Sequence, residues 1–165
     1  MGVIMLVPIV YVAAVAQTSL VDLLQVGRVA PDLLALAAIL WLLATPASPW
    51  GPLAAGAVGL LEDLISPGNV GLGAAAFLLA AYVVVRVRSR LRLEELPWRV
   101  LTVWLAVTLI EVLLAAGKWL FGELAMDPGT LVVRAVGVGV YTAGVSLPAA
   151  MVLGWIGHSH KLPQS

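Results

Sequence analysis

The chain has 165 residues, of which 62% are hydrophobic and only 11% are charged, and its mean hydropathy is +1.06. Soluble globular proteins average about 45–50% apolar and about 25% charged residues, so this composition excludes a water-soluble domain, because a small domain keeps much of its surface in water. Nine basic and nine acidic residues balance, which gives no support for nucleic-acid binding, and the absence of cysteine excludes disulfides and Cys-based metal sites.

These values predict an all-α integral membrane protein, a single domain over residues 1–165 built as a bundle of about six transmembrane helices. A spanning helix needs about 20 apolar residues. Spanning strands would alternate apolar and polar residues, unlike the continuous apolar run at residues 77–85. The expected spans are, in chain order, residues 3–24, 31–44, 50–65, 71–87, 97–120 and 131–156.

The first segment, residues 3–24, has one feature of a secretory signal. Ala14-Val15-Ala16 is a small-residue sequence of the kind that forms a cleavage site. A signal peptide also begins with basic residues, whereas the first basic residue here is Arg28. We therefore expect a retained first helix.

The second and third segments are short for full spans, which need about 20 residues. The alternative to six spans is therefore a broken, re-entrant pair at these positions, which leaves five spans. Small residues at four-residue spacing allow close helix packing in lipid. We expect helix packing at Gly51, Ala55, Gly56, Gly59, Gly71, Gly137 and Gly139.

Basic residues are concentrated between the fourth and fifth segments, at Arg86, Arg88, Arg90, Arg92 and Arg99. Short cytoplasmic loops are enriched in Lys and Arg, so we expect this connection in the cytoplasm. With six spans, both termini share that side, in an N-in, C-in arrangement. We expect the connection to contact anionic membrane lipids; a docking patch for an acidic cytoplasmic partner is the alternative.

Ionisable residues within or beside the spans are candidates for structural or partner-binding roles, because a charge in the membrane is costly. Asp32 begins the second segment, where the helix dipole stabilises a carboxylate, and we expect it to be a cap or first-turn acid of that helix. Glu62 and Asp63 end the third segment, where the dipole disfavours them. We expect Asp32 and Asp63 to form a polar element near the outer surface, with a compensating cation from Arg28, Lys118 or Arg134.

Glu111, near the middle of the fifth segment, is the deepest acid. We expect it to form an interhelical hydrogen bond or ion pair, with Thr102, Thr108 and Thr142 as polar neighbours. Pairs of acids can relay protons across membranes. We expect no second acid inside the spans that could form such a pair with Glu111.

No arrangement of residues typical of catalysis occurs in the sequence. His158 and His160 are two residues apart and so do not share a helix face. There is no Gly-x-Ser-x-Gly elbow, and no phosphate-binding loop. We therefore expect no catalytic residue, no cofactor, no metal and no nucleic-acid partner.

The order of motifs in residues 31–82 is distinctive. A Pro-Asp pair, Pro31-Asp32, opens the second span; a Gly-Leu-x-x-Asp sequence follows at Gly59, Leu60 and Asp63; and a Gly-Leu pair follows at Gly71-Leu72. This order resembles the MreD family, the rod shape-determining membrane proteins. Length, number of spans and the basic connection also fit, so the resemblance covers essentially the whole chain.

The resemblance implies a non-enzymatic scaffold of the bacterial cell-elongation machinery in the cytoplasmic (inner) membrane. It implies binding to MreC, a single-span protein with an extracytoplasmic coiled coil, and through it to the actin-like filament protein and the peptidoglycan synthase complex. The family is also similar in fold to the substrate-binding subunits of energy-coupling-factor transporters. The alternative function is therefore a transporter subunit for a vitamin or other small molecule, although the outer loops here are short for closing a pocket.

Overall fold

The computed structural model describes residues 6–24, 30–45, 48–66, 70–88, 96–122 and 128–158. For residues 20–24, 96, 128 and 147–158 it describes the backbone and not the side chains. Within these ranges the chain is all-α, with six helices and no strands. They are α1 (Leu6–Leu24), α2 (Leu33–Ala44), α3 (Trp50–Ile65), α4 (Leu72–Arg88), α5 (Leu96–Leu120) and α6 (Pro128–His158). Each helix begins and ends within three residues of the range expected from the sequence. Arg28, Arg90 and Arg92 lie outside the described residues.

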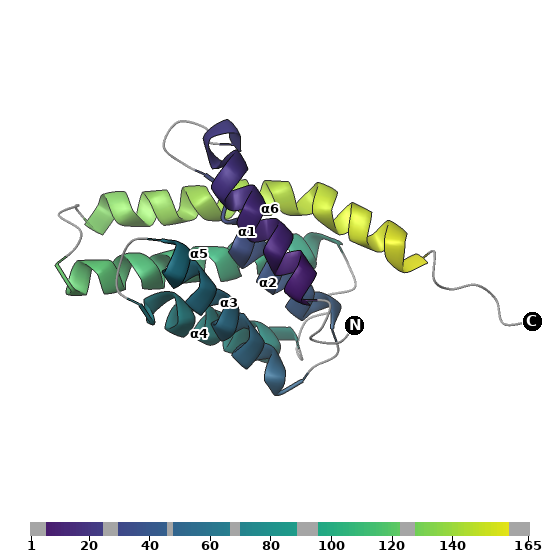
Figure 1. Ribbon diagram of the computed structural model, residues 1–165, viewed down its shortest axis with the longest axis horizontal. Coiled ribbons are helices and arrows are strands. Elements are labelled where there is room, and N and C mark those ends of the chain that lie inside the picture. The colour runs from purple at the N-terminus through teal and green to yellow at the C-terminus, as the bar shows by residue number, and fades with distance from the viewer. Residues whose placement is uncertain are drawn as a thin grey trace, which may run out of the picture.

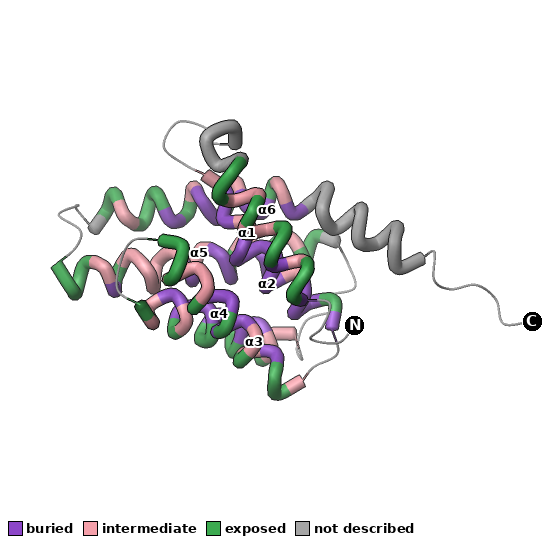
Figure 2. The backbone as a smooth tube through the Cα atoms, viewed as in Figure 1, coloured by how far each residue is buried: buried purple, intermediate pink, exposed green. Residues whose placement is uncertain are grey.

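The shortest helix, α2, is the centre of the fold. It contacts each of the other five helices, and nine of its 12 residues are buried. Its sequence is apolar on every side, which is typical of a helix that is surrounded by others. Figure 2 shows the buried positions gathered along α2 and on the facing sides of its neighbours.

Two helix pairs and one crossing helix surround α2. The long helices α5 and α6 run side by side, α3 and α4 form a second pair, and α4 packs on α5 (Figure 1). Helix α1 crosses over α2, with which it makes its main contact. The bundle therefore encloses α2 and exposes the outer faces of the surrounding helices.

Two of the described stretches are long and apolar enough to cross a membrane, residues Pro97–Leu120 and Gly129–Ser146. The apolar stretches Leu6–Ser19 and Leu33–Ala44 are shorter. Helix α2 is about 18 Å long, against a hydrocarbon core of about 30 Å. The expectation that the second segment is short for a full span is confirmed.

Candidate functional site

The side chain of Asp63 joins the end of α3 to the start of α4. Its Oδ2 accepts hydrogen bonds from the backbone N–H groups of Gly71 at 2.8 Å and Ala74 at 3.2 Å, and its Oδ1 accepts one from Gly73 at 2.8 Å. The first N–H groups of a helix lack partners within the helix, and the positive end of the helix dipole favours an anion there. The start of α4 therefore compensates the carboxylate at the end of α3.

One turn before Asp63, Gly59 brings α3 against the backbone of α4. A Cβ atom on Gly59 would lie 2.7 Å from the carbonyl carbon of Gly73 and 2.9 Å from Cβ of Phe77. A Cβ atom on Gly73 would lie 2.7 Å from the carbonyl oxygen of Gly59. The two glycines therefore permit a helix separation that larger residues would not. Gly73 was missed as a packing residue, although its position among small residues after Gly71 was a signal for it.

Gly71 has a different role from the helix packing expected of it. It lies in the turn before α4 with a φ of +104°, and a Cβ atom there would meet nothing within 4 Å. L-residues rarely adopt this backbone conformation, whereas glycine adopts it readily. The backbone conformation of the turn that directs the Gly71 N–H toward Asp63 therefore requires glycine. No contact with a described helix requires it.

The other small residues expected to pack in α3 do so to different degrees. A Cβ atom on Gly51 would lie 2.7 Å from Cδ1 of Leu42 in α2, so the contact there is tight. On Gly56 it would lie 3.4 Å from Cβ of Leu78 in α4, which is an ordinary contact distance. Ala55 is fully enclosed, at 1% exposure. The small-residue stripe of α3 therefore packs within the bundle, against α2 and α4.

Glycines also bring α5 close to its neighbours. A Cβ atom on Gly139 of α6 would clash with the Thr108 side chain and lie 3.2 Å from Cδ1 of Trp104 in α5. Gly137, two residues earlier, is half-buried. A Cβ atom on Gly117 of α5 would lie 2.7 Å from a methyl group of Leu72 in α4. Gly117 was not among the expected packing residues.

The start of α2 is a second polar junction, formed by three helices. Oδ1 of Asp32 accepts a hydrogen bond from the Ala35 N–H at 2.8 Å, and Oε1 of Gln17 in α1 accepts one from the Leu34 N–H at 2.9 Å. The N–H of Asp32 donates to Oγ1 of Thr142 in α6 at 3.1 Å. The expected capping role of Asp32 is confirmed, and side chains of the bundle satisfy backbone groups that lipid could not.

Three acids from different helices influence one another near this junction. Glu62 of α3 interacts electrostatically with Asp32 and with Glu111 of α5, and Glu111 also interacts with Asp32. Oδ2 of Asp32 and Oε2 of Glu62 are buried without a hydrogen-bond partner among the described residues. We call these three residues the acidic group. In the described part of the chain, no three acidic, His or Cys side chains are placed to share a metal ion.

The acidic group corrects one expectation from the sequence. Glu111 was expected to have no second acid near it inside the spans, and the structure brings Asp32 and Glu62 within electrostatic reach of it. The expected polar element of Asp32 and Asp63 stays a prediction. The Asp63 carboxylate is hydrogen-bonded to the start of α4 and acts electrostatically on Glu62.

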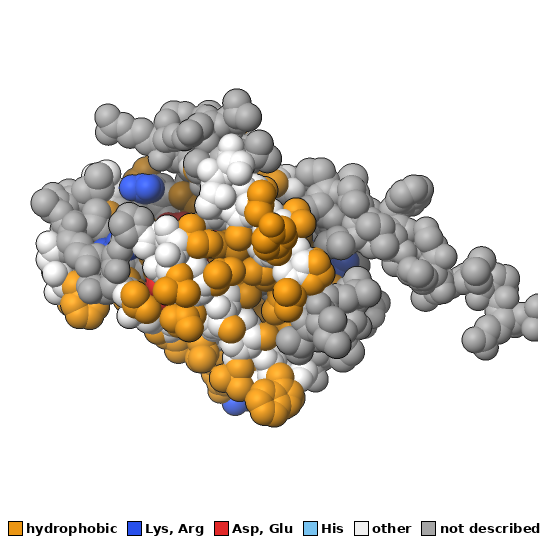
Figure 3. All heavy atoms as spheres, in the orientation of Figure 1, with side chains coloured by type: hydrophobic (Ala, Val, Ile, Leu, Met, Phe, Trp, Pro, Cys, Tyr) orange, Lys and Arg blue, Asp and Glu red, His pale blue; other side chains and the backbone are white. Residues whose placement is uncertain are grey.

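Two of the expected cations act on the acidic group. Lys118, in the last turn of α5, interacts with Glu62 and Glu111, and Arg134 of α6 interacts with Glu111. Arg134 is exposed, whereas Lys118 is half-buried. Figure 3 shows basic and acidic side chains on the same part of a mainly apolar face. Acidic and basic side chains from α2, α3, α5 and α6 therefore act on one another in this bundle, and Asp32 among them also caps α2.

The two basic residues at the end of α4 have different roles. Nη1 of Arg88 donates to the carbonyl oxygens of Leu42, at 2.8 Å, and Thr45. The cation therefore covers the C-terminal end of α2, where the helix dipole favours it. The guanidinium of Arg86 donates to the Tyr82 hydroxyl and lies 5.2 Å from the centre of its ring. Arg88 thus stabilises the fold, whereas Arg86 lies on the exposed surface.

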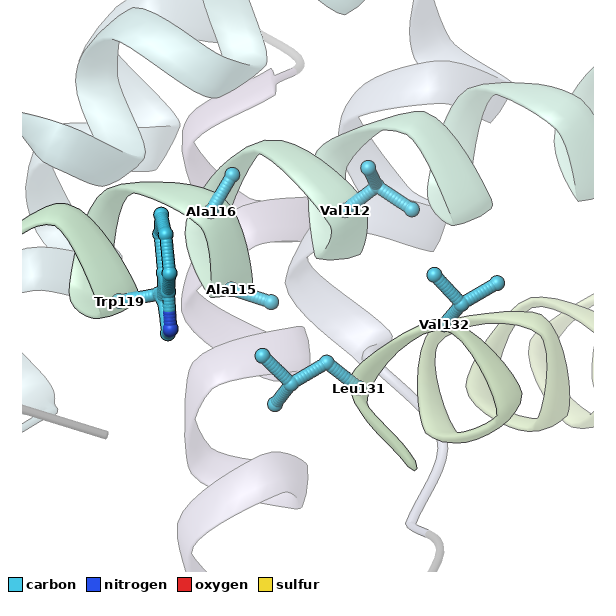
Figure 4. A pocket seen from close by; sticks show the side chains of 6 residues that line it. All are labelled: Val112, Ala115, Ala116, Trp119, Leu131 and Val132. Atoms are coloured by element: carbon cyan, nitrogen blue, oxygen red, sulfur yellow. The ribbon is translucent and has the colours of Figure 1, made fainter. Parts of the chain in front are cut away.

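Three cavities have apolar linings. One of about 310 Å³ lies between α5 and α6, whose side chains face each other across it (Figure 4): Val112, Ala115, Ala116, Trp119, Leu131 and Val132. A second, of about 580 Å³, lies between α5 and α6 near Trp104 and Val140. A third, of about 300 Å³, separates α1 from α2. These linings offer no groups for acid–base or nucleophilic chemistry.

A family model described as rod shape-determining protein MreD matches residues 1–153 of the chain. No curated protein and no solved structure matches it significantly. The matched range includes both polar junctions, the acidic group and the basic end of α4.

Proposed function

The chain belongs to the MreD family of rod shape-determining membrane proteins, as its motifs indicated, and from this premise we propose that it is a non-enzymatic scaffold of the bacterial cell-elongation machinery. In this role it binds an MreC-like single-span protein, which links it to actin-like filaments inside the cell and to the peptidoglycan synthase complex outside. The observation that carries the proposal is the family match over residues 1–153. The apolar cavities and the use of polar groups as helix caps support a packing role.

We place the protein in the inner membrane, which its chain crosses several times. Trp98 and Trp119, near the two ends of α5, are 40% and 51% exposed. Their separation of 21 positions corresponds to about 31 Å along a helix. This length matches the hydrocarbon core of about 30 Å, and Trp is enriched at both membrane interfaces. Helix α5 therefore crosses the membrane between these two side chains.

The orientation follows from the basic end of α4. The bonds from Arg88 place the end of α2 beside the end of α4, and Lys and Arg favour the cytoplasmic side. Six crossings then give an N-in, C-in protein.

The chain has no cysteine, so single introduced cysteines report their side of the membrane. In intact cells an impermeant maleimide should label Phe121→Cys and leave Ser48→Cys unlabelled; the opposite pattern would reverse the orientation.

Glu62, Glu111 and Arg134 are the polar residues that we assign to the partner. The carboxylates of Asp63 and Asp32 already accept hydrogen bonds at the starts of α4 and α2, respectively. Glu62 keeps a buried oxygen without a hydrogen bond among the described residues, and Arg134 is exposed near Glu111. An acidic or other polar side chain of a partner helix would bond to the exposed Arg134, which acts on Glu111 and through it on Glu62. Hydrogen bonds between helices in membranes contribute about 0.6–2 kcal/mol each.

Affinity purification of the tagged protein from mild detergent tests this proposal. We expect recovery of a single-span coiled-coil protein, with or without cell-wall synthases. The double variant Glu62→Gln, Arg134→Gln should reduce this recovery about tenfold, as expected for the loss of about 1.4 kcal/mol. The control Thr18→Ala removes an exposed hydroxyl whose hydrogen bonds to described residues lie within α1, and it should change nothing.

The same purification separates the alternatives. If the double variant recovers as much partner as the unaltered protein, the partner binds elsewhere than at the acidic group. Recovery of a pair of ATPases with a coupling membrane subunit would instead indicate a transport subunit. In that case the fold similarity to energy-coupling-factor subunits would gain support, and a small-molecule ligand would be sought.

A further inference from the structure

A narrow apolar slot of about 300 Å³ separates α1 from α2. Helix α2 lines it at helical spacing from Leu33 to Ala44, so the slot follows the whole length of this helix. Helix α1 contributes small side chains at Ala13 and Ala16, which leave the space between the helices unfilled. Protein interiors are normally packed as densely as organic crystals. An open seam of this kind within the membrane is accessible to the hydrocarbon chains that surround it.

The width of the slot limits what can occupy it. Helix α2 is about 18 Å long, so a volume of about 300 Å³ gives the slot a mean cross-section of roughly 17 Å². A helix about 10 Å across has a cross-section of roughly 80 Å². The slot is therefore too narrow for a transmembrane helix of a partner or of a second copy.

A positive charge lies at the end of α2 where the slot ends. Ala44 lines the slot, and its neighbour Thr45 accepts a hydrogen bond from Arg88, as does Leu42. A guanidinium carries five N–H donors, and these two bonds use a single nitrogen atom. The remaining donors have the planar geometry that binds phosphate groups.

We propose that the slot holds one acyl chain of an anionic phospholipid whose phosphate group lies against Arg88. The chain completes the packing between α1 and α2, and the headgroup lies at the membrane surface marked by the basic end of α4. The lipid is then a part of the bundle and holds α1 in place. This proposal requires only that the protein is embedded in a membrane, so it is independent of the scaffold role and its partner.

Native mass spectrometry of the full chain, delipidated and then supplied with phosphatidylglycerol or phosphatidylcholine, tests the proposal. The unaltered protein should retain one phosphatidylglycerol, about tenfold more strongly than phosphatidylcholine, because the choline cation of the latter offsets the attraction between its phosphate group and the Arg88 guanidinium. Ala13→Leu fills the slot and should lower retention of both lipids about tenfold. Val15→Leu, on the exposed face of α1, is the matched control and should retain both as before.

Two variants of Arg88 separate its effect on the lipid from its effect on α2. Arg88→Gln removes the charge and should abolish the preference for phosphatidylglycerol. Because it also removes the cap of α2, Arg88→Lys, which keeps the charge, is compared with it and should keep the preference. Lipid retention by a folded Ala13→Leu protein equal to that of the unaltered protein would overturn the proposal. An unchanged preference in both Arg88 variants would overturn the headgroup assignment.

Discussion

Gly73 of α4 faces Gly59 of α3 so closely that a Cβ atom on Gly73 would lie 2.7 Å from the carbonyl oxygen of Gly59. Four residues later in α3, Asp63 accepts three hydrogen bonds from the first backbone N–H groups of α4 and its turn. The glycine contact sets the separation of the two helices, and the carboxylate fixes their register along the axis. The Gly-Leu-x-x-Asp motif at Gly59, Leu60 and Asp63 therefore describes a helix–helix junction.

Gly59→Ala should destabilise the bundle by about 1–3 kcal/mol, the usual cost of overpacking, because the new methyl group would meet the backbone of Gly73. The control is Gly56→Ala on the same helix, whose methyl group would lie at an ordinary contact distance, 3.4 Å from Leu78. Thermal unfolding in detergent measures both. Equal effects of the two substitutions would show that α3 and α4 can move apart.

Asp63→Asn should loosen the start of α4, because the amide nitrogen cannot accept the hydrogen bonds that one carboxylate oxygen accepts. The expected loss is about 1 kcal/mol, as for other helix caps, with faster hydrogen exchange at the Gly71 and Gly73 amides. Glu62→Gln is the neighbouring control and should not lower stability, because Oε2 of Glu62 has no described partner. Unchanged exchange at Gly71 and Gly73 in Asp63→Asn would contradict the capping role.

Thr142→Val should destabilise the protein by about 1–3 kcal/mol, because it leaves the buried N–H of Asp32 without an acceptor. Thr102→Val is the matched control, since the Thr102 hydroxyl bonds to the Trp98 carbonyl of its own helix. That carbonyl also accepts a bond within α5, so the control should cost about 0.5 kcal/mol or less. Chemical unfolding in mixed detergent micelles compares the two, and a larger effect of Thr102→Val would contradict the prediction.

Gly71→Ala should cost about 1–3 kcal/mol through backbone strain, because φ at this position is +104° although the space around it is open. Gly144→Ala in α6 also meets open space, but it lies in a helix and should be neutral or stabilising, because Ala is the better helix former. The thermal midpoints of the two variants separate strain from crowding. Equal midpoints would mean that the turn before α4 can adopt another conformation.

Much of the fold could be predicted from local sequence. Apolar runs and the prolines and glycines that bound them fix the helix ranges, since these signals act within a few residues. The capping role of Asp32 was predictable for the same reason, because the residue at a helix start is recognised from its own sequence context. The shortness of the second segment was also visible in its length.

The acidic group and the role of Arg88 could not be predicted in this way. Asp32, Glu62 and Glu111 come from three helices, and only the packing of α2 inside the bundle brings them together. Arg88 lies 46 positions from Leu42, to whose carbonyl oxygen it donates a hydrogen bond. In the sequence it therefore looked like one of several basic residues in a loop. Gly71 was misassigned because a glycine needed for positive φ and a glycine needed for close packing look alike in sequence.

The bond between the Asp32 N–H and Thr142 joins positions 110 residues apart, and this separation has a consequence for biosynthesis. The ribosome releases the chain from its N-terminus, so α2 emerges long before its partner on α6 exists. Alone, a helix of 12 residues is too short to be inserted as an independent span, and unsatisfied backbone groups are costly in lipid. We therefore expect α2 to reach its final depth only after α6 has been made, so that the bundle matures by rearrangement within the bilayer.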